Sequence, residues 1–214
     1  AIIDSGINYL HKDFRNADGT TRILYIWDQT IEGNAPEGFL GGTLYTREDI
    51  NKALNTINPL EVVPSQDEIG HGTAVAGIAC GNGSSSNGRY RGVASESEII
   101  VVKLGERGRE SFARNTEIMR AIKFIIDRAI ELNMPVSINI SFGTNDGSHT
   151  GGSLFETYID DMSNIWKTAI CVATGNEGSS SHHYEDMARV GEEITVEVEV
   201  SSELSSLYIV LFKN

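Results

Sequence analysis

Apolar runs and helical periods alternate along the first 178 residues. The runs Ile99–Leu104 and Val136–Ile140 are nearly continuous and rich in β-branched residues, which is typical of strands buried on both faces. Between them, Asn115–Met134 repeats isoleucines at spacings of three and four, which predicts an amphipathic helix that ends at Pro135. Because strands alternate with helices, we expect an α/β fold whose twisted parallel sheet has helices on both faces.

Shorter signals complete this pattern. A run of small residues predicts a buried helix over 72–80, and Ser153 and Glu156 form a capping-box pattern for a helix that runs to about Trp166. Thr46 begins a short helix to Leu54, and the rest of 28–69 is expected to be irregular, with Pro59 and Pro64 ending that helix. Further strands are predicted at residues 1–3, 23–27 and 169–173.

The pattern changes after residue 190. Isoleucine and valine alternate with threonine and glutamate from Ile194 to Val200, which is typical of an antiparallel strand with one solvated face. A second apolar strand is predicted at Leu207–Phe212, with no helix between the two. We therefore divide the chain into an α/β domain at residues 1–189, incomplete as it stands, and the start of an antiparallel β module at residues 190–214.

Composition excludes some classes of function. The 214 residues carry 30 acidic and 17 basic side chains, a net charge of −13, which argues against a nucleic-acid-binding surface. No apolar run approaches the roughly 18–20 residues of a membrane span. Cys80 and Cys171 form no disulfide framework and lie in apolar segments, so we expect both to be buried free thiols in a reducing compartment.

Two residues are candidates for acid–base chemistry. His71 lies between two glycines at the start of the small-residue helix, where a rigidly held imidazole could act as a general base. Asp4 directly follows a buried strand, and open α/β sheets place their sites at such strand ends. The alternatives are a histidine that only packs or caps, and a turn aspartate that binds its own backbone.

Four short motifs occur in a distinctive order. Asp4-Ser5-Gly6, Gly70-His71-Gly72-Thr73, Ser141-Phe142-Gly143 and Gly175-Asn176-Glu177-Gly178 each fall at a strand end or a helix start. Together they closely resemble the subtilisin-like serine proteases, the subtilases, over residues 1–178. The segment 190–214 resembles the subgroup with a β-sandwich inserted between the oxyanion asparagine and the nucleophile, as in the clostridial spore-germination proteases.

The resemblance implies peptide-bond hydrolysis by an Asp–His–Ser triad. Asp4 would orient His71, which would take the serine proton, and Asn176 would donate to the oxyanion. An extended polypeptide substrate would bind as an added strand. The residues that the resemblance assigns to substrate binding are Ser141, Phe142, Gly143, Gly105 and Gly175.

The resemblance also has departures. Subtilases carry their nucleophile in a Gly-Thr-Ser-x-Ala pattern, and these 214 residues contain none. We expect the serine to lie outside this chain, which alone would be inactive. A propeptide or a complementing segment of the same protein is a candidate partner. The alternative is a catalytically inactive subtilase-like binding or sensor scaffold. A bacterial intracellular or spore-associated location is a guess that follows from the resemblance.

We expect no cofactor and no metal site. Asp13 matches a position that binds calcium in many subtilases, but the partner loop at residues 81–92 differs in length and sequence from the usual one, so we expect Asp13 to be a plain loop acid. Calcium at Asp13 remains the alternative. His182 and His183 lie in a serine-rich stretch without the carboxylates or thiols that would complete a site.

Overall fold

The computed structural model describes residues 1–105, 115–141, 149–176, 178–180, 182, 184–203, 205, 207 and 209–211. The described strands are β1 (Ile2–Asp4), β2 (Ile23–Asp28), β3 (Thr43–Thr46), β4 (Ile99–Lys103), β5 (Val136–Ile140) and β6 (Thr168–Val172). The described α-helices are α1 (Arg47–Leu54), α2 (Pro59–Val62), α3 (His71–Cys80), α4 (Asn115–Glu131) and α5 (Leu154–Ser163). Single 3₁₀ turns, η1 and η2, occur at Lys12–Phe14 and Ser84–Ser86.

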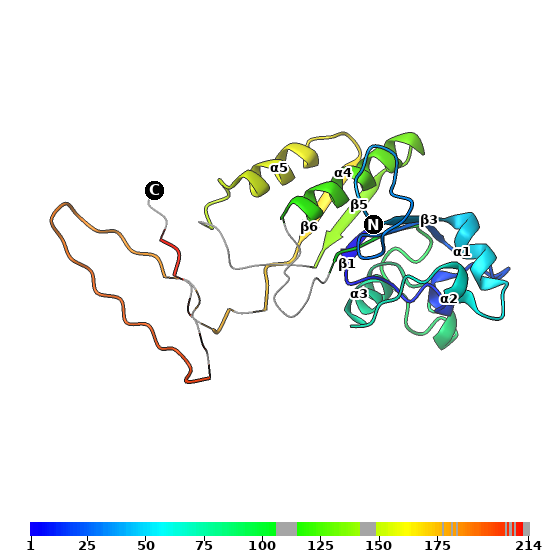
Figure 1. Cartoon of the computed structure of the whole chain (residues 1–214), viewed down its shortest axis with the longest axis horizontal. Coiled ribbons are helices and arrows are strands. Elements are labelled where there is room, and N and C mark those ends of the chain that lie inside the picture. Colours follow the sequence, from blue (N-terminus) through cyan, green and yellow to red (C-terminus); the bar gives the residue numbers. More distant parts are fainter. Residues whose placement is uncertain are drawn as a thin grey trace.

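The strands form one sheet in the order β3-β2-β4-β1-β5-β6. Neighbouring strands are parallel except for β3, which pairs antiparallel with β2. Helices cover both faces, with α4 and α5 on one side and α1, α2 and α3 on the other (Figure 1). The α/β fold class, with a mostly parallel sheet, is confirmed.

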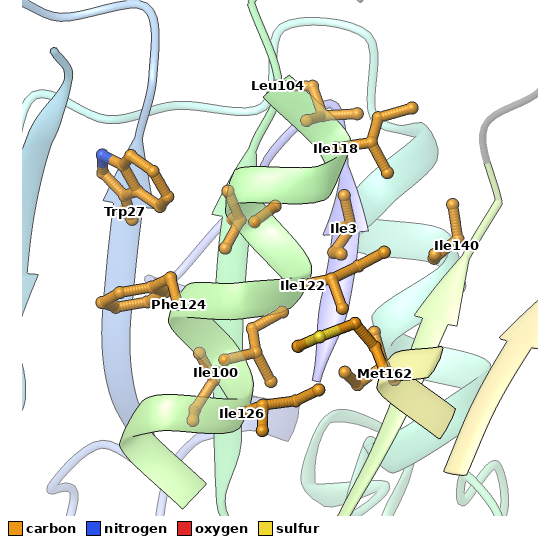
Figure 2. Packing of buried hydrophobic residues seen from close by; sticks show 14 residues of the cluster. Ile3, Trp27, Ile100, Leu104, Ile118, Ile122, Phe124, Ile126, Ile140 and Met162 are labelled. Carbon is orange, nitrogen blue, oxygen red and sulfur yellow. The ribbon is translucent and has the colours of Figure 1, made fainter. Parts of the chain in front are cut away.

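Alternate residues of the central strands face two separate cores. Ile3, Ile100 and Val102 pack with the apolar stripe of α4, and Figure 2 shows Ile122 and Phe124 in that core. The neighbours Ile2, Ile99 and Val101 point to the other face and pack with α1 and α3. This alternation follows from the two-residue period of a strand, and it explains why the central strands read as continuous apolar runs.

Local capping signals predicted two helix starts correctly. The Thr46 side chain accepts the Asp49 amide while the Asp49 carboxylate accepts the Thr46 amide, and Ser153 and Glu156 make the same reciprocal pair. Each capping box satisfies backbone N–H groups that the helix itself leaves unpaired. α5 ends at Ser163, three residues before the predicted end at Trp166.

Three expectations were wrong. Residues 28–69 are less irregular than expected, because they contain β3 and α2. Pro59, which was expected to end a helix, is the first residue of α2, since proline is tolerated in a first helical turn. α3 is not fully buried; only the stripe of Gly72, Ala76 and Cys80 is, and Ile78 is 74% exposed. Cys171 is exposed because it lies on the edge strand β6, whereas Cys80 is buried as expected.

The tail of the chain leaves the α/β body. After Val172 the described residues form no helix or strand, and they run as an open loop away from the sheet (Figure 1). The predicted strand at Ile194–Val200 is therefore not formed here, and the division into a domain and a β module stays a prediction. In the portion of the chain that is described, no helix has the length and apolar character needed to span a bilayer.

Candidate active site

Four neighbouring strands bring polar motifs to one edge of the sheet. Gly105 lies beyond the carboxyl end of β4, Asp4 ends β1, Ser141 follows β5, and Asn176 follows β6. Because β4, β1, β5 and β6 are adjacent and parallel, these residues share an edge in that spatial order. β6 stands two strand spacings from β1, about 10 Å.

The central contact at this edge joins Asp4 to His71. The Asp4 side chain is 3% exposed, and its Oδ1 lies 2.8 Å from Nδ1 of the His71 ring. The same oxygen accepts the amide of Ser5 at 2.7 Å, while Oδ2 is buried without a partner among the described residues. The His71 side chain is 51% exposed. The pair therefore combines a desolvated carboxylate with an imidazole that solvent can reach.

A close approach of two glycines makes this contact possible. A Cβ atom at Gly72 would stand 2.2 Å from the carbonyl oxygen of Gly6 and 3.1 Å from Cβ of Asp4. α3 therefore reaches the end of β1 only because residue 72 has no side chain. Gly70, the N-cap of α3, has φ 82°, a left-handed conformation that glycine adopts without strain.

Asp67 is a residue of this site that the motifs did not indicate. Its Oδ1 accepts the Ser5 hydroxyl at 2.8 Å and the Gly70 amide at 2.9 Å. Its Oδ2 accepts the amide and the hydroxyl of Thr73 at 2.8 and 2.6 Å. Partial burial acts to raise the pKa of Asp67, but the hydrogen bonds from Thr73, Ser5 and Gly70 outweigh it and lower that pKa below 3.8.

A second buried polar cluster lies next to this one. Asp28, at the end of β2, is fully buried and accepts the Ser65 hydroxyl at 2.5 Å and the amide of Thr30 at 2.9 Å. Nζ of Lys103, at the end of β4, lies 3.9 Å from Asp28 and donates to the Gln66 carbonyl at 2.7 Å. In the sequence, the only sign of this cluster is that Asp28 and Lys103 are charged residues at the ends of two apolar runs.

The predicted substrate-binding residues are placed less closely together. Ser141 accepts a hydrogen bond from Asn139 at 2.8 Å, and Phe142 and Gly143 lie outside the described residues. Gly105 is buried, and the one described group that a Cβ there would meet is a Thr30 methyl at 3.9 Å. Among the described residues, none lies close enough to Gly105 to require that it lack a side chain.

The loop after β6 carries the predicted oxyanion donor. Gly175 has φ 88°, and Asn176 is exposed. The Asn176 amide makes no hydrogen bond with any described residue. Asn176 follows a strand that lies two places from β1 in the sheet, and its role as an oxyanion donor stays a prediction.

Asp13 is hydrogen-bonded to the loop that follows α3. Its Oδ1 accepts the Ser85 amide at 2.6 Å and its Oδ2 accepts the Ser85 hydroxyl at 3.0 Å. Calcium takes six to eight oxygen ligands, so an ion at Asp13 would have to displace these hydrogen bonds and find further oxygens. No cluster of three or more His, Cys, Asp or Glu side chains that could hold a metal occurs within the described ranges.

Comparison with known proteins identifies a family. Residues 1–206 match the sequence profile of the subtilase family, Peptidase_S8. The chain belongs to the subtilase family. This subtilase is 31% identical to a subtilisin of Bacillus sp. (strain TA39) over 179 residues, which cover 83% of this chain and 33% of that protein. It is 27% identical to the major intracellular serine protease of Bacillus subtilis over 215 residues, covering 96% and 52% of the two chains.

Solved structures give the same family. The structure of the Clostridium perfringens CspB protease matches this subtilase with a TM-score of 0.74 and 42% identity, over 85% of this chain and 37% of that one. The S41 psychrophilic protease matches with a TM-score of 0.54 and 28% identity, over 83% and 45%. The chain thus spans about a third to a half of these relatives. The expected resemblance to subtilisin-like serine proteases is confirmed.

Proposed function

We propose that this chain supplies the acid, base and oxyanion donor of a serine endopeptidase whose nucleophilic serine lies outside these 214 residues. Asp4 accepts the Nδ1–H of His71, which fixes the tautomer that leaves Nε2 free to take a serine proton. His71 later returns that proton to the leaving amine. Asn176 donates to the oxyanion of the tetrahedral intermediate.

The Asp4–His71 contact is the observation that carries the proposal. A general base needs a nitrogen that solvent and substrate can reach, and the His71 side chain is half exposed. The orienting acid must hold one tautomer, and the almost fully buried Asp4 is 2.8 Å from Nδ1. A histidine that only packed or capped would need neither a buried carboxylate partner nor an exposed ring edge.

Membership of a protease family implies a polypeptide substrate. We propose that the substrate binds in an extended form between the segments that follow β4 and β5, where Gly105 and Ser141 lie on either side of Asp4. Main-chain hydrogen bonds would give affinity, as in other cases of strand addition. Gly105 would let the substrate backbone approach closely, because it has no Cβ atom.

The test uses the full-length gene product and a serine-directed fluorophosphonate. We expect covalent labelling of a serine outside residues 1–214, and loss of labelling in His71→Ala. In Asn176→Ala, we expect the fluorophosphonate to label the same serine. Peptide hydrolysis should have a kcat roughly a hundredfold lower, the size of effect established for the oxyanion asparagine of subtilisin itself. Lys123→Met, on the exposed face of α4, is the matched control and should label like wild type.

The catalytically inactive scaffold remains the second candidate function. It predicts no labelling of the full-length protein under any activation condition, with ligand-dependent changes in thermal stability and no peptide cleavage. Absence of a downstream serine in the full-length sequence would decide for the scaffold. A labelled serine that requires His71 would decide against it.

A further inference from the structure

Asp67 connects the two elements that carry the proposed acid and base. It lies four residues before His71 and accepts four hydrogen bonds, three of them from Gly70 and Thr73 at the start of α3. The fourth comes from Ser5, which directly follows Asp4 at the end of β1. An ordinary helix cap satisfies only the amides of its own helix, so the bond to Ser5 is beyond what capping requires.

Ser5 extends this connection back to the helix. Its hydroxyl donates to Asp67 at 2.8 Å and accepts the Gly72 amide at 3.0 Å, while its own amide donates to Asp4 at 2.7 Å. The Asp4 turn and the first turn of α3 are therefore joined through one hydroxyl and one carboxylate. The two turns cannot separate without breaking these bonds, and His71 lies between the joined residues.

The segment that bears Asp67 is itself attached to the sheet. Ser65 donates to the fully buried Asp28 at 2.5 Å, and the Gln66 carbonyl accepts Lys103 at 2.7 Å. Three consecutive residues are thus bonded to β2, to β4, and to the β1–α3 junction. This attachment limits how far the Asp67 carboxylate can move with the loop.

We propose that Asp67 is a positioning residue for His71: it holds the start of α3 against the Asp4 turn, so that Nδ1 of His71 stays within hydrogen-bond reach of Asp4. Its importance for catalysis rests on the proposed function. The positional effect can be measured without any peptide cleavage, because the hydrogen bond to Asp4 sets which ring nitrogen of His71 carries the proton.

The experiment is ¹⁵N NMR of the histidine ring in the full-length chain at about pH 8.5, roughly two units above the ordinary histidine pKa. Wild type should show His71 protonated on Nδ1. Asp67→Ala should reduce that fraction by about twofold or more, because the freed helix start no longer holds the ring against Asp4. Asp67→Asn, which keeps one acceptor oxygen, should give an intermediate value.

Asp49→Ala is the matched control. Asp49 caps α1 in the same way, by accepting the amide and hydroxyl of Thr46, but it has no hydrogen bond to the β1–α3 junction. It should lower stability and leave the His71 tautomer unchanged. A role of Asp67 in stability alone predicts that Asp67→Ala behaves like Asp49→Ala, and that result overturns the inference.

Ser5→Ala keeps the inference testable if Asp67→Ala does not fold. It removes the Ser5 hydroxyl, and with it both the bond to Asp67 and the bond from the Gly72 amide that join the Asp4 turn to the start of α3, so it should also reduce the Nδ1-protonated fraction. A folded Ser5→Ala protein with the wild-type tautomer overturns the inference alone. A wild-type His71 protonated on Nε2 would overturn the Asp4–His71 pairing, and with it both the inference and the proposed function.

Discussion

A methyl group at Gly72 would stand 2.2 Å from the carbonyl oxygen of Gly6. These two glycines mark the place where α3 meets the end of β1, one residue after His71 and two after Asp4. The atoms of Gly6 that the methyl group would meet belong to the backbone. No flexible side chain could therefore move aside to relieve the clash. The distance between the proposed acid and base therefore depends on the absence of a Cβ at residue 72.

Gly72→Ala should destabilise the protein by about 1–3 kcal/mol, because α3 must shift away from β1. Gly77→Ala is the control on the same helix: a Cβ there meets nothing within 4 Å, and alanine in a helix interior should stabilise by about 0.5–1 kcal/mol. Urea denaturation measures both. A Gly72→Ala protein as stable as wild type would contradict this account of the contact.

Lys103→Met should cost about 3–5 kcal/mol, because it leaves the fully buried carboxylate of Asp28 without a compensating cation. Lys123→Met removes the exposed pair with Asp127 and should cost less than about 1 kcal/mol. Adding Asp28→Asn to Lys103→Met should recover much of the loss. Equal losses for the two lysine variants would show that burial of Asp28 does not determine the effect.

The contribution of Asp67 to stability should depend on pH. Its pKa is lowered in the folded state, because hydrogen bonds from Thr73, Ser5 and Gly70 outweigh partial burial. A lowered folded-state pKa gives stability that is present above the unfolded value of 3.8 and is lost as pH falls through the folded pKa. The free energy of unfolding should therefore differ between wild type and Asp67→Asn more at pH about 6 than at pH about 3.

Asp161→Asn is the control for that comparison, since Asp161 is an exposed carboxylate on α5. Its difference from wild type should stay small at both values of pH. Guanidinium denaturation at the two pH values measures each variant. If the Asp67→Asn difference were the same at both, ionisation of Asp67 would not contribute to folding.

Calcium should not stabilise the loop at Asp13. Both carboxylate oxygens of Asp13 accept hydrogen bonds from Ser85, so a cation would have to displace these donors. We expect the melting temperature to be the same in excess EDTA and in millimolar calcium, and Ser85→Ala to lower it in both. A rise in melting temperature on adding calcium that is lost in Asp13→Asn would show that Asp13 binds the ion.

Much of the fold could be predicted because its signals are local. Hydrophobic period alone indicated the strands β4 and β5 and the helix α4, and capping residues located the starts of α1 and α5. The motif around His71 also predicted a histidine at a helix start and an aspartate at a strand end. Each of these signals depends on residues within a few positions along the chain. It can therefore be interpreted without knowing which elements pack against each other.

The sequence by itself thus determined the order of most strands and helices, with β3 and α2 as exceptions, and the chemical type of the proposed acid and base. Only the tertiary structure decided that Asp67 bridges Ser5 and Thr73, that Lys103 lies beside Asp28, that α3 has an exposed face, and that Cys171 lies on an edge strand. These are relationships between segments far apart along the chain. They depend on how the strands pair and on which elements cover each face of the sheet. The hydrophobic period of a single segment predicts neither of these.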